Sequence, residues 1–267
     1  MRSTWLNIPT RVEPYSQLAL IYDYVMRHVN YGRWANYMRD LFSHADQEVV
    51  RVLDIACGTG SLILKLSELG FRVAGFDESL GMVQEARAKG RARRLRIPFW
   101  RASMRSFALR RPVDAIVCTY DSINYCLDEA TCAEVFDSVA LAVRPGGLLV
   151  FDICTVRNSR KHFRRYYEKE ETEEFRYIRQ SYYIASNSIQ VNEFYIQRES
   201  SPLVREIHQQ RIYKIDEIMK TIPGDRFQVM GVYDGFSMKS GSEESDRVHF
   251  VLKRTQGGSR PVAYAST

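Results

Sequence analysis

The stretch from Val52 to Gly60, which reads VLDIACGTG, constrains the fold of this chain more than any other. An apolar run ends in Asp54, a Gly-x-Gly turn follows, and an apolar helical pattern then extends to Gly70. This order predicts a strand, a tight glycine turn and a helix. Glycines allow the backbone to approach a ligand closely, and a helix N-terminus offers free N–H groups. We therefore expect a nucleotide-like ligand at this turn of an open α/β sheet.

Residues around the turn narrow the type of ligand. A dinucleotide fingerprint needs a third glycine where this chain has Ile63, and a phosphate loop needs a lysine, whereas Ser61 follows Gly60 here. The chain has acids instead, Asp54 before the glycines and Asp77 at the end of the next apolar run. An acid in the position of Asp77 can accept hydrogen bonds from both ribose hydroxyls of an adenosine cofactor. These features disfavour a nicotinamide dehydrogenase and favour an adenosine-type ligand without pyrophosphate.

Strand and helix patterns alternate along the first 152 residues. The predicted strands lie at 49–55, 71–76, 97–101, 113–118 and 148–151, and helices are predicted at 59–69, 79–89 and 128–143. The near-continuous apolar run at 113–118 is typical of a parallel strand that is buried on both faces. The alternation predicts an α/β fold with a doubly wound, Rossmann-like sheet.

The pattern changes before and after this region. Residues 1–48 read as an extended arm followed by an aromatic-rich helical cap, with a bend near 30–32. Residues 160–213 read as an inserted antiparallel sheet with strands at 175–185, 189–197 and 203–213. A helix at 215–222 and strands at 227–236 and 247–254 then complete the first sheet, so 49–159 and 214–255 form one domain. We expect 256–267, rich in Gly, Ser and Ala, to be a flexible tail.

Charge, apolar runs and cysteines limit the class of protein. The net charge is +6, and ten Lys/Arg residues without an acid lie between Arg87 and Arg111. This stretch is either a nucleic-acid face or a solvated helix end and loop rim, and the acidic patch at 168–174 argues against a uniformly basic groove. No apolar run approaches the ~20 residues that span a bilayer. Five cysteines show no CxxC and no metal-ligand spacing, so we expect a cytoplasmic protein without a metal or membrane contact.

Five stretches, in this order, resemble the motifs of class I S-adenosylmethionine-dependent methyltransferases. They are Val52–Gly60, Gly75–Asp77, Ala102–Met104, Val113–Tyr120 and Leu141–Asp152. More narrowly, the tyrosines and tryptophan at 22–34 and the sequence YDSINY at 120–125 resemble a bacterial small-molecule subgroup. That subgroup is related to amino-sugar N,N-dimethyltransferases and to glycine N-methyltransferase-like enzymes. The resemblance implies S-adenosylmethionine as cofactor and an antiparallel last strand.

The resemblance also implies roles for individual residues toward this cofactor. Turn residues would lie against its methionyl part, and Asp54 would orient the ammonium group; the turn set is Asp54, Ala56, Cys57, Gly58 and Gly60. Tyr22 and Arg33 would hold the methionyl carboxylate, for which arginine is geometrically suited. Met82 and Met104 would sandwich the adenine ring. Ser103 stands where relatives commonly have an aspartate, so it would accept the adenine amino group more weakly. Cys118 and Tyr120 would lie under the sulfonium.

Methyl transfer from a sulfonium needs mainly in-line positioning and exclusion of water. A general base is needed only where the acceptor is protonated, and the candidate catalytic residues are Tyr120, Tyr125 and His208, with Asp121 as a further possible base. We predict transfer to N or O of a small molecule. The alternatives are an RNA acceptor bound by residues 87–111 and a regulatory protein that binds S-adenosylmethionine without turnover. The inserted sheet, with its exposed aromatic strands, also allows a homodimer.

Overall fold

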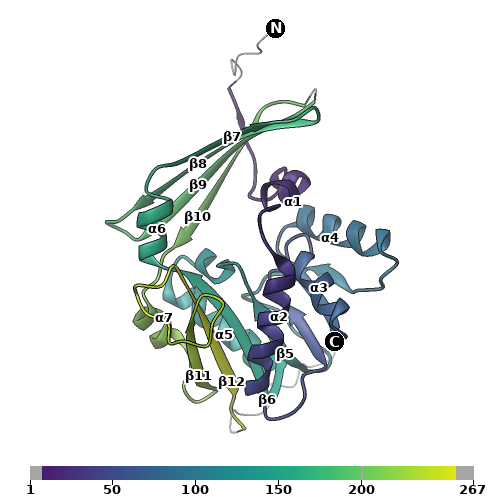
Figure 1. The fold of residues 1–267 in the computed structure, drawn as a ribbon, viewed down its shortest axis with the longest axis vertical. Coiled ribbons are helices and arrows are strands. Elements are labelled where there is room, and N and C mark those ends of the chain that lie inside the picture. The colour runs from purple at the N-terminus through teal and green to yellow at the C-terminus, as the bar shows by residue number, and fades with distance from the viewer. Residues whose placement is uncertain (1–7, 200, 257–267) are drawn as a thin grey trace, which may run out of the picture.

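Two sheets of different kinds make up the computed structural model, which describes residues 8–199 and 201–256 (Figure 1). The larger sheet has seven strands in the order β11-β12-β6-β5-β2-β3-β4. Its strands are β2 (Arg51–Asp54), β3 (Arg72–Asp77), β4 (Phe99–Arg101), β5 (Val113–Cys118), β6 (Val143–Cys154), β11 (Phe227–Asp234) and β12 (Arg247–Arg254). β12 pairs antiparallel with both β6 and β11, and the other neighbouring strands of this sheet pair in parallel. This confirms the predicted mostly parallel sheet with an antiparallel last strand.

Helices cover both faces of this sheet, as a doubly wound fold requires. They are α2 (Tyr31–Leu41), α3 (Ser61–Glu68), α4 (Leu80–Ala92), α5 (Glu129–Ala142) and α7 (Ile215–Thr221). One buried cluster joins α5 and α7 to the sheet through Phe136, Val139 and Ile218. A second cluster, on the other face, joins α2 and α3 through residues such as Met38 and Leu66. The predicted helices and strands are therefore confirmed, with ends that differ by a few residues.

Side-chain caps fix several of these helices. The Ser79 hydroxyl accepts from the Met82 N–H at 3.3 Å, and the Asp128 carboxylate accepts from the Thr131 N–H at 2.7 Å. Asn30 caps α2 in the same way, accepting from the Arg33 N–H at 2.9 Å. The cap at Asn30 explains the bend that the sequence predicts near 30–32.

The smaller sheet has strand order β1-β10-β9-β8-β7. Its strands are β1 (Thr10–Arg11), β7 (Tyr166–Glu171), β8 (Phe175–Ile184), β9 (Ile189–Arg198) and β10 (Val204–Arg211). The three predicted strands are present, and two more were not predicted. β7 consists of two tyrosines followed by four charged residues, so it has no apolar periodicity. β1 comes from the N-terminal arm and pairs in parallel with β10. A further helix, α6 (Val156–His162), precedes β7 and was also not predicted.

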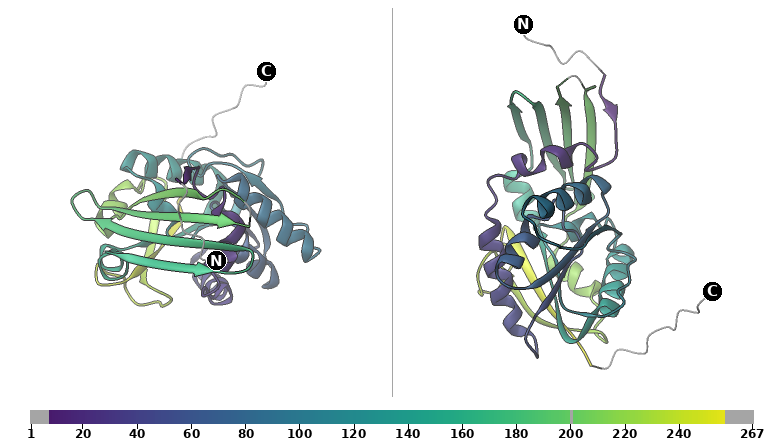
Figure 2. Two further views of the ribbon diagram at one scale, coloured as in Figure 1. Left: turned by 90° about the horizontal axis from the view of Figure 1, so that it is seen from above. Right: turned by 90° about the vertical axis from the view of Figure 1, so that its right-hand side faces the viewer.

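The smaller sheet lies above one end of the larger one, the end at which its parallel strands finish (Figure 2). The N-terminal segment runs between the two sheets as the short helices η1 (Leu18–Ile21) and α1 (Tyr22–Val25). Leu18, Ile21 and Val25 pack against Tyr177 and Phe194 of the smaller sheet. The loop after β5 contains a further turn of helix, η3 (Ser122–Tyr125). The N-terminal segment, η3 and the smaller sheet therefore cover the carboxyl ends of the parallel strands, which is where open α/β sheets bind ligands.

The predicted tail at 256–267 lies, apart from Gln256, outside the described residues. Within the described parts of the chain, no helix is both long enough and apolar enough to cross a membrane. All five cysteines are buried with free thiols.

Candidate active site

The glycine turn between β2 and α3 adopts the backbone conformation that its sequence predicts. Gly58 and Gly60 have φ angles of +53° and +79°, a region that side chains disfavour. A Cβ atom on Gly60 would lie 3.1 Å from the Phe99 ring, so this glycine also permits close packing of the turn on β4. At Gly58 the nearest atom would be 4.0 Å away, on the Tyr22 ring. Gly58 therefore presents its backbone to open space beneath Tyr22.

Asp77, at the end of β3, is tied to this turn. One carboxylate oxygen accepts from the Gly58 N–H and the other from the Ser79 N–H, both at 2.9 Å. Each oxygen keeps a further lone pair, because an ionised carboxylate has about four acceptor positions. Burial raises the pKa of Asp77, although these backbone N–H groups oppose the rise. Asp77 can therefore still accept two hydroxyl groups of a ligand.

Asp54, at the end of β2, is almost fully buried beside Asp77. Its carboxylate accepts from the Ala56 N–H at 3.1 Å. Burial raises the pKa of Asp54 to about 7, the Ala56 N–H lowers it, and the charge of Asp77 raises it. A cation placed here would stabilise the ionised carboxylate and offset the cost of its burial. The position therefore suits a ligand ammonium group.

Two cavities, each of about 670 Å³, lie above the carboxyl ends of the strands. The first cavity contains Asp77, Leu80 and Met104. The second cavity extends from the glycine turn to the smaller sheet. Both cavities are lined by Tyr15, Ala56, Ser122 and Tyr125, so they meet at these residues. A larger open groove of about 1350 Å³, between α6 and α7, contains none of the predicted site residues.

Most of the predicted site residues line one of these cavities. Ala56, Asp77, Met104 and Tyr125 line the first, and the second is lined by Tyr22, Asp54, Ala56, Cys57, Gly58, Met82, Tyr120, Tyr125 and His208. The structure leaves four predicted residues outside both cavities. Gly60 and Cys118 are buried in the protein, and the hydroxyl of Ser103 accepts from the Arg105 N–H at 3.4 Å. Arg33 is exposed, with its guanidinium 4.4 Å from the centre of the Phe236 ring.

A chain of polar side chains joins the N-terminal segment, η3 and β10 at the junction of the cavities. The Tyr125 hydroxyl lies 2.5 Å from the Tyr15 hydroxyl and 3.1 Å from Nδ1 of His208. The other ring nitrogen of His208 lies 3.2 Å from the Glu206 carboxylate. Burial raises the pKa of Glu206, but His208 and the N–H groups of Leu18 and Gln17 more than offset it and lower the pKa overall. The predicted pair Tyr125 and His208 is thus in contact, held by Tyr15 and Glu206, which were not predicted.

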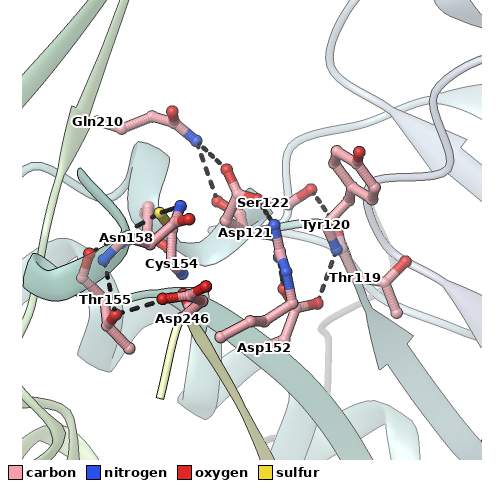
Figure 3. Close-up of polar contacts among 12 residues, drawn as sticks. Thr119, Tyr120, Asp121, Ser122, Asp152, Cys154, Thr155, Asn158, Gln210 and Asp246 are labelled. Carbon is pink, nitrogen blue, oxygen red and sulfur yellow. Dashed lines mark hydrogen bonds and ion pairs between the residues drawn. The ribbon is translucent and has the colours of Figure 1, made fainter. Parts of the chain in front are cut away.

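A second polar cluster fixes the loop after β5, where Tyr120 lies (Figure 3). Tyr120 and Asp121 both have positive φ angles, +62° and +53°, which non-glycine residues rarely adopt. Their N–H groups donate to the buried Asp152 carboxylate at 2.6 and 2.9 Å. Arg247 forms ion pairs with both Asp121 and Asp152. This cluster, which we call the Asp152 clamp, comprises Tyr120, Asp121, Asp152 and Arg247, and it holds Tyr120 in a strained conformation at the cavity wall.

No group of three or more His, Cys, Asp or Glu side chains in the described residues is arranged to hold a metal ion. Sequence reasoning missed Tyr15, Glu206 and Arg247. The aromatic richness of the N-terminal segment was the only signal for Tyr15. Glu206 and Arg247 are strand residues whose partners depend on how distant segments pack.

Comparisons with known proteins agree with this arrangement. A methyltransferase domain family matches residues 52–147. A protein of Geobacillus sp. (strain WCH70) that is assigned as a methyltransferase is 29% identical over 245 residues, which cover 90% of this chain and 99% of that protein. A dTDP-3-amino-3,4,6-trideoxy-alpha-D-glucopyranose N,N-dimethyltransferase of Streptomyces venezuelae is 28% identical over 49% of this chain and 55% of its own.

A solved structure shares the fold over nearly the whole chain. The crystal structure of an S-adenosylmethionine-dependent methyltransferase from Clostridium acetobutylicum superposes with a TM-score of 0.77 at 24% identity, and it covers 90% of this chain and 99% of its own. The glycine turn, with Asp54 and Asp77 beside it, lies within the matched family domain. Residues 52–147 thus match a methyltransferase domain, and the chain shares the fold of an S-adenosylmethionine-dependent methyltransferase over nearly its whole length.

Proposed function

We propose that this enzyme transfers a methyl group from S-adenosylmethionine to a nitrogen or oxygen atom of a small molecule bound in the second cavity. One observation carries the proposal. The first cavity, which contains Asp77, meets the second cavity at Ala56, Ser122 and Tyr125. A cofactor on Asp77 and the glycine turn would therefore face a cavity of about 670 Å³, within the range of pockets for small molecules.

The residues present fit the cofactor. Asp77 would accept the ribose hydroxyls, because both of its oxygens keep free lone pairs beside the first cavity. Met104 and Leu80 give that cavity an apolar wall for the adenine ring. Asp54, Gly58 and Tyr22 line the second cavity and would hold the methionyl part. Arg33 stacks on Phe236, so we assign no cofactor contact to it in this conformation.

When bound, S-adenosylmethionine supplies a methyl group that is already electrophilic. The protein would therefore need to exclude water and align the acceptor. Residues 160–213 would act as a lid and 1–48 as a cap, since their side chains close the second cavity over the 49–159 and 214–255 domain. Where the acceptor loses a proton, the Tyr125 hydroxyl and Nδ1 of His208 are placed to receive it.

Isothermal titration with S-adenosylmethionine and with NAD tests the cofactor, and S-adenosylhomocysteine production tests turnover. The acceptors would be small amines and alcohols, among them amino sugars, because a relative acts on one. We expect binding of S-adenosylmethionine but not NAD, and turnover with at least one acceptor. Cofactor binding without turnover on any amine, alcohol or RNA would contradict the proposed acceptor.

The basic stretch at 87–111 gives only weak support to an RNA acceptor. Many of its cations have partners within the protein. Arg87 donates to the Phe99 carbonyl and Arg101 to the Glu78 carbonyl, while Lys89, Arg93 and Arg105 pair with Asp23, Glu68 and Glu134. If RNA were the acceptor, its binding would weaken steeply as salt is added. Absence of RNA binding at low salt would exclude it.

We also propose a cytoplasmic location, because five buried free thiols fit a reducing compartment. The outward residues Tyr167 and Tyr182 on the smaller sheet are exposed, which makes a homodimer through this sheet a further proposal. Sedimentation of the wild-type protein and of a Tyr167→Glu/Tyr182→Glu variant tests it. A wild-type monomer at micromolar concentration would contradict the dimer.

A further inference from the structure

Two arginines line the second cavity, and their electrostatic states differ. Arg247 is neutralised by Asp121 and Asp152 in the Asp152 clamp. Arg179, on β8, forms no ion pair with any carboxylate in the part of the chain that the structure describes. Lys161, the other long cation of the lining, pairs with Asp246. Arg179 is thus a half-buried positive charge that the protein leaves without a counter-charge.

Hydrogen bonds and rings hold the Arg179 side chain in place. Its Nε donates to the Ser181 hydroxyl at 3.2 Å, and Nη2 donates to the side-chain Oδ1 of Asn192 at 3.1 Å. Ser181 and Asn192 are themselves buried and are joined by a hydrogen bond of 2.6 Å. The guanidinium carbon also lies 5.3 to 5.4 Å from the ring centres of Phe163, Tyr166 and Phe194. The charge is therefore fixed in position before any ligand arrives.

The carboxylate of Glu168, across the strand from Arg179, forms hydrogen bonds with other residues. Glu168, on β7, is the cross-strand partner of Arg179 and also lines the second cavity. Its carboxylate accepts from the Tyr177 hydroxyl at 2.7 Å and from the Tyr166 hydroxyl at 3.1 Å instead. Opposite charges facing each other on a sheet usually pair. Here the Glu168 carboxylate accepts hydrogen bonds from two tyrosines. The Arg179 guanidinium, which also lines the cavity, forms no ion pair with it.

Arg179 lines the same cavity as the candidate catalytic residues Tyr120, Tyr125 and His208. Its positive charge lowers the pKa of Tyr120 and of Tyr125, although burial raises both more strongly. A group bound to Arg179 would thus lie within one small molecule's length of the Tyr125–His208 pair.

We infer that the methyl acceptor carries an oxyanion, a carboxylate or a phosphate, and that Arg179 binds it. This inference rests on the proposed function, because it describes the acceptor of that reaction. A guanidinium is suited to planar, paired contacts with oxyanions, and a half-buried positive charge without a paired carboxylate favours an anionic ligand. The held geometry reduces the side-chain entropy that binding would otherwise cost. Arg179 is then a residue that determines acceptor specificity.

Binding of three simple probes tests the inference: benzoate, phenyl phosphate and the neutral benzamide, each with saturating S-adenosylhomocysteine. We expect one anion or both to bind the wild type more tightly than benzamide. Arg179→Gln should weaken that anion at least tenfold, and Arg179→Lys less, since it keeps the charge but loses the planar fork. Benzoate alone would identify a carboxylate site, and phenyl phosphate alone a phosphate site.

Arg205→Gln is the matched control, because Arg205 lies in the same sheet, pairs with Glu193 and does not line the cavity. It should leave anion binding within twofold of wild type. Equal binding of benzamide and both anions, or an unchanged anion affinity in Arg179→Gln, would overturn the inference. If Arg179→Gln no longer binds S-adenosylhomocysteine, Arg179→Lys becomes the variant that decides. Failure of the wild type to bind S-adenosylhomocysteine would instead count against the proposed function.

Turnover gives an independent result. Acceptors would be tested in matched pairs, each amine or alcohol once with a free carboxylate or phosphate and once as the amide or the unphosphorylated form. We expect turnover to favour the anionic members, with KM raised at least tenfold in Arg179→Gln. Equal turnover of the neutral members would contradict the inference while leaving methyl transfer itself intact.

Discussion

Nδ1 of His208, on β10 of the smaller sheet, lies 3.1 Å from the hydroxyl oxygen of Tyr125, which follows β5 of the larger sheet. The contact joins the two sheets at the point where the two cavities meet. Burial raises the pKa of Tyr125 well above its ordinary value, so the phenol stays protonated near neutral pH. We propose that a proton leaving the acceptor passes through the Tyr125 hydroxyl to His208, whose other ring nitrogen lies against the Glu206 carboxylate.

The first prediction concerns this proton path. We expect His208→Gln to lower kcat about 100-fold, the low end of what a positioned acid or base contributes, with S-adenosylmethionine affinity within twofold of wild type. Single-turnover kinetics and cofactor titration measure the two quantities. His44→Gln is the control. His44 is hydrogen-bonded to the Tyr233 hydroxyl and lines neither cavity. An unchanged kcat in His208→Gln would mean that the acceptor reacts without this path.

The second prediction concerns the proposed contact of Asp77 with the cofactor ribose. Asp77→Ala removes both acceptor oxygens beside the first cavity, and it also leaves the Gly58 and Ser79 N–H groups without their partner. We expect S-adenosylmethionine to bind at least tenfold more weakly, measured by calorimetry. Asp40→Ala is the control, because Asp40 is an exposed aspartate that lines neither cavity. An affinity close to that of wild type would exclude the ribose role.

The third prediction follows from the buried carboxyl of Asp54. Its pKa is raised to about 7 in the folded protein, while an aspartate in the unfolded chain ionises near pH 4. Between these values the folded state keeps a proton that the unfolded state has released. Asp54 therefore makes the cofactor-free protein less stable as pH rises from about 4 to about 7, by up to about 1.4 kcal/mol per pH unit, and adds no slope above pH 7.

Urea unfolding at several pH values measures this effect. Asp54→Asn should reduce the fall in stability between pH 4 and 7 relative to wild type. Asp114→Asn is the contrasting control, because Arg51 and Arg144 hold the pKa of Asp114 down to about 2 against its burial. The Asp114 contribution is present above pH 4 and is lost only as pH falls toward 2. The same slope in wild type and Asp54→Asn would contradict a raised pKa.

The sequence predicts the larger sheet well because its signals are local. The glycine turn, the caps at Ser79 and Asp128, and the apolar run of β5 each depend on a few consecutive residues. β7 was missed because its tyrosines and glutamates form hydrogen bonds and ion pairs in place of an apolar face, as at Glu168 and Glu170. β1 was missed because two residues become a strand only through pairing with β10.

The candidate site also combines residues that local sequence predicts with residues that only distant packing brings together. The turn and Asp77 were predictable because they are close in sequence. Tyr15 and Tyr125 are 110 residues apart, and Asp121 and Arg247 are 126 apart, so their contacts exist only once the two sheets and the N-terminal segment have packed. Arg33 fitted the expected pattern, yet the nearby Phe236 ring provides a stacking surface outside both cavities. Acceptor specificity, which depends on such distant contacts, was for this reason not readable from the sequence.

The last prediction concerns the Asp152 clamp. Arg247 lies between Asp121 and Asp152, and Asp152 has no exposed side-chain surface. Arg247→Met would leave two buried carboxylates without a cation, so we expect a loss of about 3–5 kcal/mol in unfolding free energy at pH 8. Burial raises the pKa of both aspartates, so a lower pH favours their neutral forms, and we expect the loss to be smaller at pH 5 than at pH 8. Arg247→Met/Asp152→Asn, which removes one of the two charges, should be more stable at pH 8 than Arg247→Met alone. Denaturant unfolding at both pH values measures these differences, and a pH-independent loss below about 1 kcal/mol would show that the clamp does not depend on this ion pair.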